Sequence, residues 1–258
     1  SGGPCIFGTP GAETLVGVTF DDGYRDNYEC AFPILKRYNV PATIFLTTGS
    51  LDSSDPLWFE QLAEAVKKTT HEFIDLEMDL PRRFWMRTEA ERLQANKDIF
   101  GLLRVLDDDQ RRLRLEEILA RLGAAKEYER RGKMLAWDQV RLMNRHGIDF
   151  GGHTVTHPFL SKLTGRQALW EVAECKRRIE EELQKPADFF AYPNGQEEDF
   201  ATSSKELLRT AGYRGAVTTI WGMNYCSTDR MELKRGGPWE ENPALFALKL
   251  DWYQLANE

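Results

Sequence analysis

Short apolar runs alternate with helical segments along much of this chain, and this alternation most constrains the fold. Residues 15–20 (LVGVTF) and 42–48 (ATIFLTT) are rich in β-branched and aromatic residues, which is typical of buried strands. Residues 26–38, which lie between them, have the apolar spacing of a helix. A strand, a helix and a second strand in this order predict a parallel pair with the helix as the crossover. The pattern therefore predicts an α/β fold.

The same alternation returns near Trp137 and extends the expected sheet. We expect three more helices at 137–147, 164–183 and about 203–212, and three more strands at 148–150, 189–192 and 216–220. The second of these helices opens with a capping-box pattern, and its expected apolar face is Leu169, Val172, Ala173, Ile179 and Leu183. In a β/α barrel the loops that follow the strands carry the chemistry, so residues 21–24, 151–158 and 193–195 are the places to examine.

Residues 51–133 interrupt this pattern. They are charged and mostly helical in period, and they contain an apolar stripe formed by Leu115, Ile118, Leu119 and Leu122. We expect a helical insertion packed on the main fold, with a separate helical domain as the lesser alternative. A chain of 258 residues is long enough for one barrel domain, so we expect residues 1–258 to form a single domain.

Composition excludes several classes of protein. The net charge of −7 lacks the electrostatic footprint of a nucleic-acid binder, and no apolar run reaches the ~18–20 residues of a membrane span. The four cysteines form no C-x-x-C pair, which argues against a zinc finger or a thioredoxin site. The first residues lack the pattern of a signal peptide, which leaves a cytoplasmic protein or a trimmed extracytoplasmic chain. The sequence sets no expectation for the oligomeric state.

Two adjacent carboxylates, Asp21 and Asp22, follow the first expected strand. Successive side chains at the end of a strand point in different directions, so one carboxylate can bind a cation while the other faces a substrate. A polar Asp-Gly turn without function is the plain alternative.

Two of the four histidines of the chain, His153 and His157, lie in the loop after a later expected strand. A bent loop can bring both imidazoles together, although a pair of solvent-exposed histidines is the alternative. Together with Asp22 they would form a site of two imidazoles and one carboxylate, which binds a divalent ion and leaves positions open. Asp21 would then be free to act as a general base toward a water.

The sequence resembles the polysaccharide deacetylase family, also called the NodB-homology domain or carbohydrate esterase family 4. The motifs that carry the resemblance are TFDDGY (19–24), PATIFL (41–46), GGHTVTHPFLSKLT (151–164) and FAYPNG (190–195). The clear resemblance covers about residues 14–50 and 134–220. It implies a distorted (β/α) barrel and metal-dependent hydrolysis of the N-acetyl groups of an amino-sugar polysaccharide or oligosaccharide.

The resemblance also implies roles for individual residues. Asp21 matches the family's catalytic base, and Asp22, His153 and His157 match its metal ligands. The ion is expected to be one divalent metal, zinc first, with cobalt, nickel or iron as alternatives that such a site accepts. The stretch containing Tyr192, Pro193 and Asn194 matches a wall of the substrate groove. In the family, a backbone N–H near this loop helps to hold the oxyanion.

Two departures from the family pattern affect the expected mechanism. The family often has an arginine, which pairs with the base, where this chain has Ala191; Arg235 is a candidate to replace it, and a purely structural Arg235 is the alternative. The family also supplies a general acid from a late histidine, but this chain has no histidine after His157. The proton for the leaving amine would then come from Asp21 acting in both directions, from a metal-bound water, or from a late residue such as Asp229.

Aromatic side chains could add a surface for stacking sugar rings. The candidates are Trp58, Trp137, Trp221, Tyr225 and Trp239, and ordinary core packing is the alternative for each. Trp221 and Trp239 flank the last expected strand and are the better groove candidates; Trp239 and Arg235 are counted with the substrate-binding residues.

The sequence is compatible with three functions. The first is an N-deacetylase that acts on an acetylated amino-sugar glycan. The second is an O-acetyl esterase of a glycan. The third is a non-catalytic glycan-binding domain that retains the metal ligands, which the missing late histidine would favour and the intact Asp21 would not.

Overall fold

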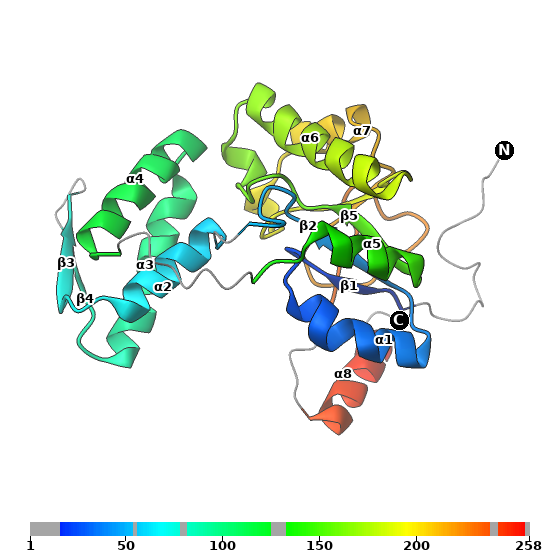
Figure 1. Ribbon diagram of the computed structural model, residues 1–258, viewed down its shortest axis with the longest axis horizontal. Helices are drawn as coiled ribbons and strands as arrows, with labels where there is room; N and C mark the ends of the chain where they lie inside the picture. The colour runs from blue at the N-terminus through cyan, green and yellow to red at the C-terminus, as the bar shows by residue number, and fades with distance from the viewer. Residues whose placement is uncertain (1–15, 54–55, 78–81, 125–132, 238–241, 256–258) are drawn as a thin grey trace.

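The computed structural model describes residues 16–53, 56–77, 82–124, 133–237 and 242–255. A five-stranded parallel sheet forms the centre, in the order β1 (Val18–Phe20), β2 (Ala42–Leu46), β5 (Ile148–Gly152), β6 (Phe189–Ala191) and β7 (Gly215–Val217) (Figure 1). The sheet is curled, with helices along it, and this confirms the expected distorted (β/α) barrel. The strand ends differ from the prediction by one to three residues. Strand β1 begins at Val18, β2 ends at Leu46, β5 extends to Gly152, β6 ends at Ala191, and β7 spans Gly215–Val217.

The crossover helices follow the expected order. A π-helical turn, η1 (Asn27–Ala31), leads into α1 (Phe32–Tyr38), where Pro33 sits in the first turn and needs no backbone N–H. Asn39 ends α1 in the left-handed conformation, with φ 51°. The later helices are α5 (Trp137–Arg145), α6 (Gly165–Leu183) and α7 (Thr202–Thr210).

Helix α6 packs on β5 and contributes to the core beneath the sheet. Its capping box is confirmed, since Thr164 accepts a hydrogen bond from the Gln167 amide. Its buried face differs from the prediction: Leu169 is exposed, and the buried positions are Ala168, Glu171, Val172, Cys175 and Ile179. These positions recur at intervals of three and four residues, so a glutamate lies among the apolar side chains.

The insertion is not purely helical. It consists of α2 (Trp58–Lys68), the antiparallel hairpin of β3 (Phe73–Leu76) and β4 (Arg82–Trp85), α3 (Glu89–Val105) and α4 (Asp108–Arg121). The hairpin was not predicted. Its first strand alternates exposed and buried side chains in the period of two that a half-buried strand requires.

The insertion has a hydrophobic cluster of its own, which includes Leu62, Ile99 and Ile118 and takes in Phe159 from the barrel side. Figure 1 shows the insertion as a lobe beside the sheet, with α2 nearest to the barrel. That the insertion and the barrel form a single domain stays a prediction.

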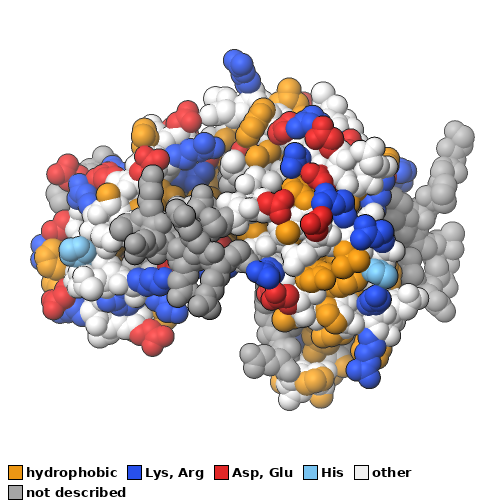
Figure 2. All heavy atoms as spheres, viewed as in Figure 1, with side chains coloured by type: hydrophobic (Ala, Val, Ile, Leu, Met, Phe, Trp, Pro, Cys, Tyr) orange, Lys and Arg blue, Asp and Glu red, His pale blue; other side chains and the backbone are white. Residues whose placement is uncertain are grey.

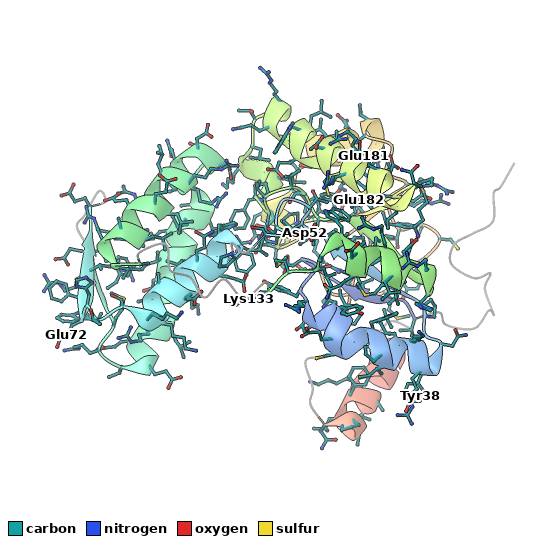
Figure 3. The ribbon with its side chains drawn as sticks, in the orientation of Figure 1. Tyr38, Asp52, Glu72, Lys133, Glu181 and Glu182 are labelled. Atoms are coloured by element: carbon teal, nitrogen blue, oxygen red, sulfur yellow. The ribbon has the colours of Figure 1, made fainter. Side chains whose placement is uncertain are left out.

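The two chain segments that connect the insertion to the barrel lie against each other. The Asp52 amide donates to the Leu135 carbonyl at 3.2 Å, and Asp52 Oδ1 accepts from the Trp137 amide at 3.3 Å. Figure 3 places Asp52 and Lys133 at this junction, and Lys133 pairs with Glu60 of α2 at 3.6 Å. The chain therefore leaves the barrel and returns to it at nearly the same point.

A last helix, α8 (Pro243–Leu255), follows the barrel, and short 3-10 turns, η2 (Leu160–Lys162) and η3 (Glu197–Asp199), flank α6 and α7. Acidic and basic side chains are interspersed on the face shown in Figure 2. Across the described ranges, the structure holds no helix with the length and apolar character that crossing a bilayer requires.

Candidate active site

The first part of the site is the tight turn that follows β1. The Gly23 amide donates to the Asp21 carbonyl at 2.9 Å, and Asp22 lies in the left-handed region with φ 70°. Gly23 also has a positive φ of 82°, and a Cβ there would lie 2.9 Å from a methyl carbon of Leu46. This turn sends the Asp21 and Asp22 side chains in different directions, as the sequence predicts.

The second part is the loop after β5, residues 153–157, which we call the metal loop. The His153 amide donates to the Leu46 carbonyl at 2.9 Å and so ties the start of the loop to β2. Thr154 and His157 both have positive φ, at 68° and 58°. The Thr154 hydroxyl accepts from the His157 amide at 3.0 Å, which folds the loop back on itself and leaves the two imidazole centroids 4.9 Å apart.

The structure brings the three predicted metal ligands together. Asp22 Oδ1 lies 3.3 Å from His153 Nε2 and 3.2 Å from His157 Nε2. One ligand atom from each residue falls within 4.8 Å of the others. Ligands about 2.0–2.2 Å from a tetrahedral zinc ion lie roughly 3.3–3.5 Å from one another, so these spacings suit a divalent ion.

The polar atoms of the triad also fit a cation better than they fit one another. Asp22 Oδ1 is buried and has no hydrogen-bond partner among the described residues, and its distances to the imidazoles exceed the ~2.7–2.9 Å of charge-assisted hydrogen bonds. His153 Nδ1 lies 2.7 Å from the Ala191 carbonyl. Because a carbonyl only accepts, Nδ1 carries the proton and Nε2 keeps a lone pair for a metal.

The electrostatics of the triad favour an ionised carboxylate. Burial alone would raise the pKa of Asp22, but the adjacent imidazoles of His153 and His157 outweigh burial and hold the pKa well below its ordinary range. One ionised carboxylate and two imidazoles form the donor set that zinc and related ions take.

Asp21 does not share the partners of Asp22 but is held by Arg235. The guanidinium forks onto the carboxylate, with Nη1 to Oδ1 at 2.8 Å and Nη2 to Oδ2 at 2.7 Å. Its Nε donates to the Thr218 carbonyl at 2.7 Å, which fixes the fork. Burial would raise the pKa of Asp21, but the hydrogen bonds and the charge of Arg235 oppose burial, and the pKa is lowered from its ordinary value. Arg235 therefore contacts the expected base through both of its Nη atoms.

The groove residues expected from the FAYPNG motif have different surroundings. The Tyr192 side chain is buried, stacks on Phe200 at 4.3 Å and donates its hydroxyl to the Met231 carbonyl at 2.9 Å. Its ring thus lies in the core rather than in a groove, because it packs in a buried hydrophobic cluster that includes Phe200 and Met231. Pro193 is also buried, whereas Asn194 Nδ2 is buried without a hydrogen-bond partner among the described residues.

The aromatic candidates for stacking sugar rings differ in how far they are buried. Trp58 and Trp137 pack in the insertion core and the barrel core, whereas Trp221 and Tyr225 are about half exposed. Trp239 lies outside the described residues.

Asp229, which the sequence offers as a late acid, pairs instead with two cations of α7. Its carboxylate lies 3.3 Å from Lys205 Nζ and 3.2 Å from Arg209 Nη2.

Sequence reasoning missed two residues that contact the metal loop, Glu171 and Trp58. Glu171 is only 2% exposed and accepts hydrogen bonds from the loop, although no motif marks it. Its signal is a single acidic residue at an apolar position of α6. Trp58 was weighed only for sugar stacking or core packing, yet its indole Nε1 donates to the His157 carbonyl at 2.9 Å.

Known proteins resemble this chain in sequence and in fold. The family model described as "Polysaccharide deacetylase" matches residues 8–115 and 116–216. A Bacillus subtilis (strain 168) protein named "Putative polysaccharide deacetylase YxkH" is 24% identical over 211 residues, which cover 81% of this chain and 46% of that protein. The chain thus spans about half the length of this curated relative.

Two solved structures share the fold. The deacetylase PplD of Streptococcus pyogenes, in complex with acetate, is 20% identical with a TM-score of 0.52, and the match covers 87% of this chain and 64% of that one. IcaB of Ammonifex degensii is 19% identical with a TM-score of 0.55, covering 94% and 74%. The family match spans far more than half of the residues, so the chain belongs to the polysaccharide deacetylase family.

Proposed function

We propose that this protein is a metal-dependent hydrolase that removes N-acetyl groups from an amino-sugar polysaccharide or oligosaccharide. The observation that carries the proposal is the pairing of two carboxylates with two different partners at one end of the sheet. Asp22 Oδ1 lies against His153 and His157, while Asp21 next to it is held by Arg235. A metal-dependent acyl hydrolase needs this combination of an ion site and a separate base.

The chain's own residues would divide the work as follows. A divalent ion held by Asp22, His153 and His157, zinc before cobalt, nickel or iron, would supply Lewis acidity at the acyl oxygen and an acidified water. Asp21 is ionised at neutral pH, because Arg235 lowers its pKa, and it would take the proton from the attacking water. Arg235 keeps both carboxylate oxygens of Asp21 in a fixed plane during this step.

Donors for the developing oxyanion are limited in the loop after β6. The Tyr192 amide already donates to the Val217 carbonyl at 3.1 Å, and the Gly195 amide donates to the Pro193 carbonyl at 2.7 Å. The unpartnered Nδ2 of Asn194 supports this residue as the loop's donor. Because Asp229 is engaged by α7, Asp21 is the residue that would return its proton to the leaving amine.

Acetate release from chito-oligosaccharides and from poly-N-acetylglucosamine tests the proposal. Metal-loaded protein should release acetate, and Asp21→Asn and His153→Ala should each lose that activity. Asp149→Asn and His146→Ala are matched controls, because both residues are exposed; Asp149 pairs with Lys185, and His146 lies beside Lys36. Both controls should keep the activity.

The other outcomes separate the alternatives. Acetate release from O-acetylated glycans but not from N-acetylated ones would replace the proposal with an esterase. One equivalent of bound metal without release from any acetylated glycan would indicate a glycan-binding domain instead.

A further inference from the structure

We propose that Glu171 and Trp58 are positioning residues that hold the metal loop in the shape that presents His153 and His157. The inference rests on the proposed function, because it concerns the same metal site. Neither residue belongs to the motifs of the family resemblance, and Trp58 belongs to the insertion, which carries none of them. The proposal assigns the insertion a part in the active site.

The metal loop needs external support because its backbone is in an unfavourable conformation. Thr154 and His157 adopt positive φ, and a β-branched residue such as Thr154 rarely does so. Such conformations persist only where the surroundings determine them, and they are common at functional sites. The internal hydrogen bond from the His157 amide to Thr154 closes the loop but leaves the amides of residues 155 and 156 unused.

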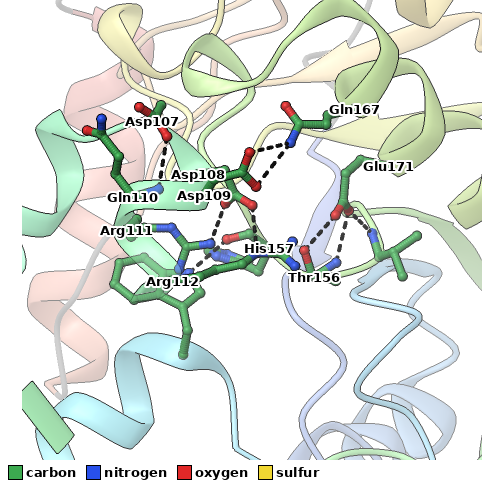
Figure 4. Close-up of polar contacts among 12 residues, drawn as sticks. Asp107, Asp108, Asp109, Gln110, Arg111, Arg112, Thr156, His157, Gln167 and Glu171 are labelled. Atoms are coloured by element: carbon green, nitrogen blue, oxygen red, sulfur yellow. Dashed lines mark hydrogen bonds and ion pairs between the residues drawn. The ribbon is translucent and has the colours of Figure 1, made fainter. Parts of the chain in front are cut away.

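Glu171 satisfies those two amides. Its Oε2 accepts from the Val155 amide at 2.7 Å and from the Thr156 amide at 2.9 Å, and its Oε1 accepts from the Thr156 hydroxyl at 2.5 Å (Figure 4). The carboxylate is almost completely buried. A buried carboxylate is costly unless it is well hydrogen-bonded, so its place on the apolar face of α6 makes sense as a clamp on the middle of the loop.

Trp58 holds the end of the loop. Its indole Nε1 donates to the carbonyl of His157, which is itself a proposed ligand. The indole is locked in place by neighbours: Phe100 stacks on it at 5.3 Å, and the Arg111 guanidinium lies 4.4 Å from its centre. Both neighbours belong to the insertion, so the orientation of this donor depends on the packing of the insertion.

These contacts act through the backbone of the loop rather than on the ligand atoms. Partners behind the ligands of metal sites orient them, and losing such a partner typically costs about 10–100-fold in metal affinity. Glu171 fixes residues 155 and 156 between the two histidines, and Trp58 fixes the second histidine. Together they span the loop from its middle to its end.

Binding of Co²⁺ to the full chain tests the proposal by calorimetry and by the visible spectrum of the bound ion. Glu171→Leu and Trp58→Phe should each weaken binding about 10–100-fold and shift the cobalt spectrum, because the ligand geometry changes. Glu171→Gln should lose less affinity than Glu171→Leu, since its amide oxygen can still accept from the loop amides. Trp58→Phe keeps the aromatic cluster filled, so it remains a folded test if Glu171→Leu does not fold.

Matched controls distinguish positioning from general destabilisation. Glu174→Gln changes a glutamate of the same helix that pairs with Arg177, and Trp137→Phe changes a buried tryptophan of the barrel core. Both should bind Co²⁺ with the affinity and spectrum of the unmodified protein. Wild-type affinity and spectrum in Trp58→Phe and in folded Glu171 variants would overturn the proposal. Failure of the unmodified protein to bind Co²⁺ would instead overturn the metal site.

Discussion

Asp21 and Asp22 are neighbours in sequence and identical in chemistry, but their partners give them different properties. Asp22 faces two imidazoles, and Asp21 faces one guanidinium. The turn at Gly23 makes this division possible, because it lets two successive side chains diverge within one loop. The same residue type therefore supplies both a metal ligand and a base in the proposed site.

The pairing of Asp21 with Arg235 predicts a change in pH dependence. Replacing Arg235 with Met removes the hydrogen bonds that lower the pKa of Asp21 and leaves burial, which raises it. The base is active when deprotonated, so activity is lost as pH falls through this pKa. In Arg235→Met the acidic limb of the kcat/KM profile should move to higher pH, and kcat should fall at least about 10-fold.

A pH–rate profile of the deacetylation reaction measures this shift. Arg214→Met is the control, because Arg214 is a surface residue that pairs with Asp188. An unchanged acidic limb in Arg235→Met would show that Arg235 does not tune the base.

The burial of Cys175 predicts low reactivity toward alkylating reagents. Burial raises the pKa of its thiol to about 12, and its sulfur lies 3.5 Å from the Leu46 carbonyl. The thiolate is the reactive form, so at pH ~8 Cys175 should resist iodoacetamide in the folded protein, whereas the exposed Cys30 should react. Mass spectrometry of the labelled peptides checks this, and labelling of both cysteines in urea serves as the control. Labelling of Cys175 as fast as Cys30 would contradict the buried position.

The residues of the site were predictable where local sequence carries the signal. Asp22, His153 and His157 could be grouped because their motifs follow strands whose ends meet at one edge of a parallel sheet. The pairing of Arg235 with Asp21 joins residues 214 positions apart, and the sequence left a structural arginine equally open. The core position of Tyr192 could not be predicted either, because it depends on packing against Phe200.

At the scale of elements, helix α6 connects the fold with the site. Thr164 begins the helix, and Glu171, two turns later, contacts the metal loop. The apolar residues of this segment fit two different helical faces. The sequence therefore identified the helix but not the side that it buries, since a buried glutamate contradicts the usual pattern.

The capping box of α6 predicts a stability effect. Thr164→Ala removes the acceptor for the Gln167 amide, so the free energy of unfolding should fall by about 1 kcal/mol. Urea denaturation measures this, and Thr164→Ser should keep most of the stability because it retains the hydroxyl. Equal losses in the two variants would show that the hydroxyl does not cap the helix.

The β3–β4 hairpin shows why the insertion was harder to predict than the barrel. Each of its strands is four residues long, and a single apolar residue in Arg82–Trp85 is buried. So short an alternation cannot be separated from a helical period by sequence alone. The predicted stripe of Leu115, Ile118, Leu119 and Leu122 is longer and runs along α4 to its C-cap. Leu115, Ile118 and Leu122 are buried and Leu119 is half-buried, which confirms that part of the prediction.

At the scale of the whole molecule, the proposed metal ligands come from the loops after β1 and β5, two strands that both border β2. An ion bound there joins segments that are more than 100 residues apart, so it should stabilise the folded state. At a free Zn²⁺ concentration about 100 times Kd, the expected gain is roughly 2.7 kcal/mol. Calorimetric melting with Zn²⁺ and with a chelator measures this gain.

The variant His157→Ala should lose the gain from Zn²⁺, because one ligand is gone. His71→Ala, which changes an exposed histidine of the insertion, should keep it. A zinc-dependent gain that survives in His157→Ala would place the ion elsewhere.

The contact between Asp52 and Leu135 matters for engineering this protein. When the two ends of an insertion lie at hydrogen-bonding distance, the insertion can be deleted and the gap closed with a few residues. The insertion of this chain can therefore be exchanged for another segment. The hydrogen bond from the Trp58 indole to the His157 carbonyl limits that exchange, because it joins the insertion to the metal loop. A replacement segment would have to supply a donor at the same point, in addition to matching the two chain ends and the packing against Phe159.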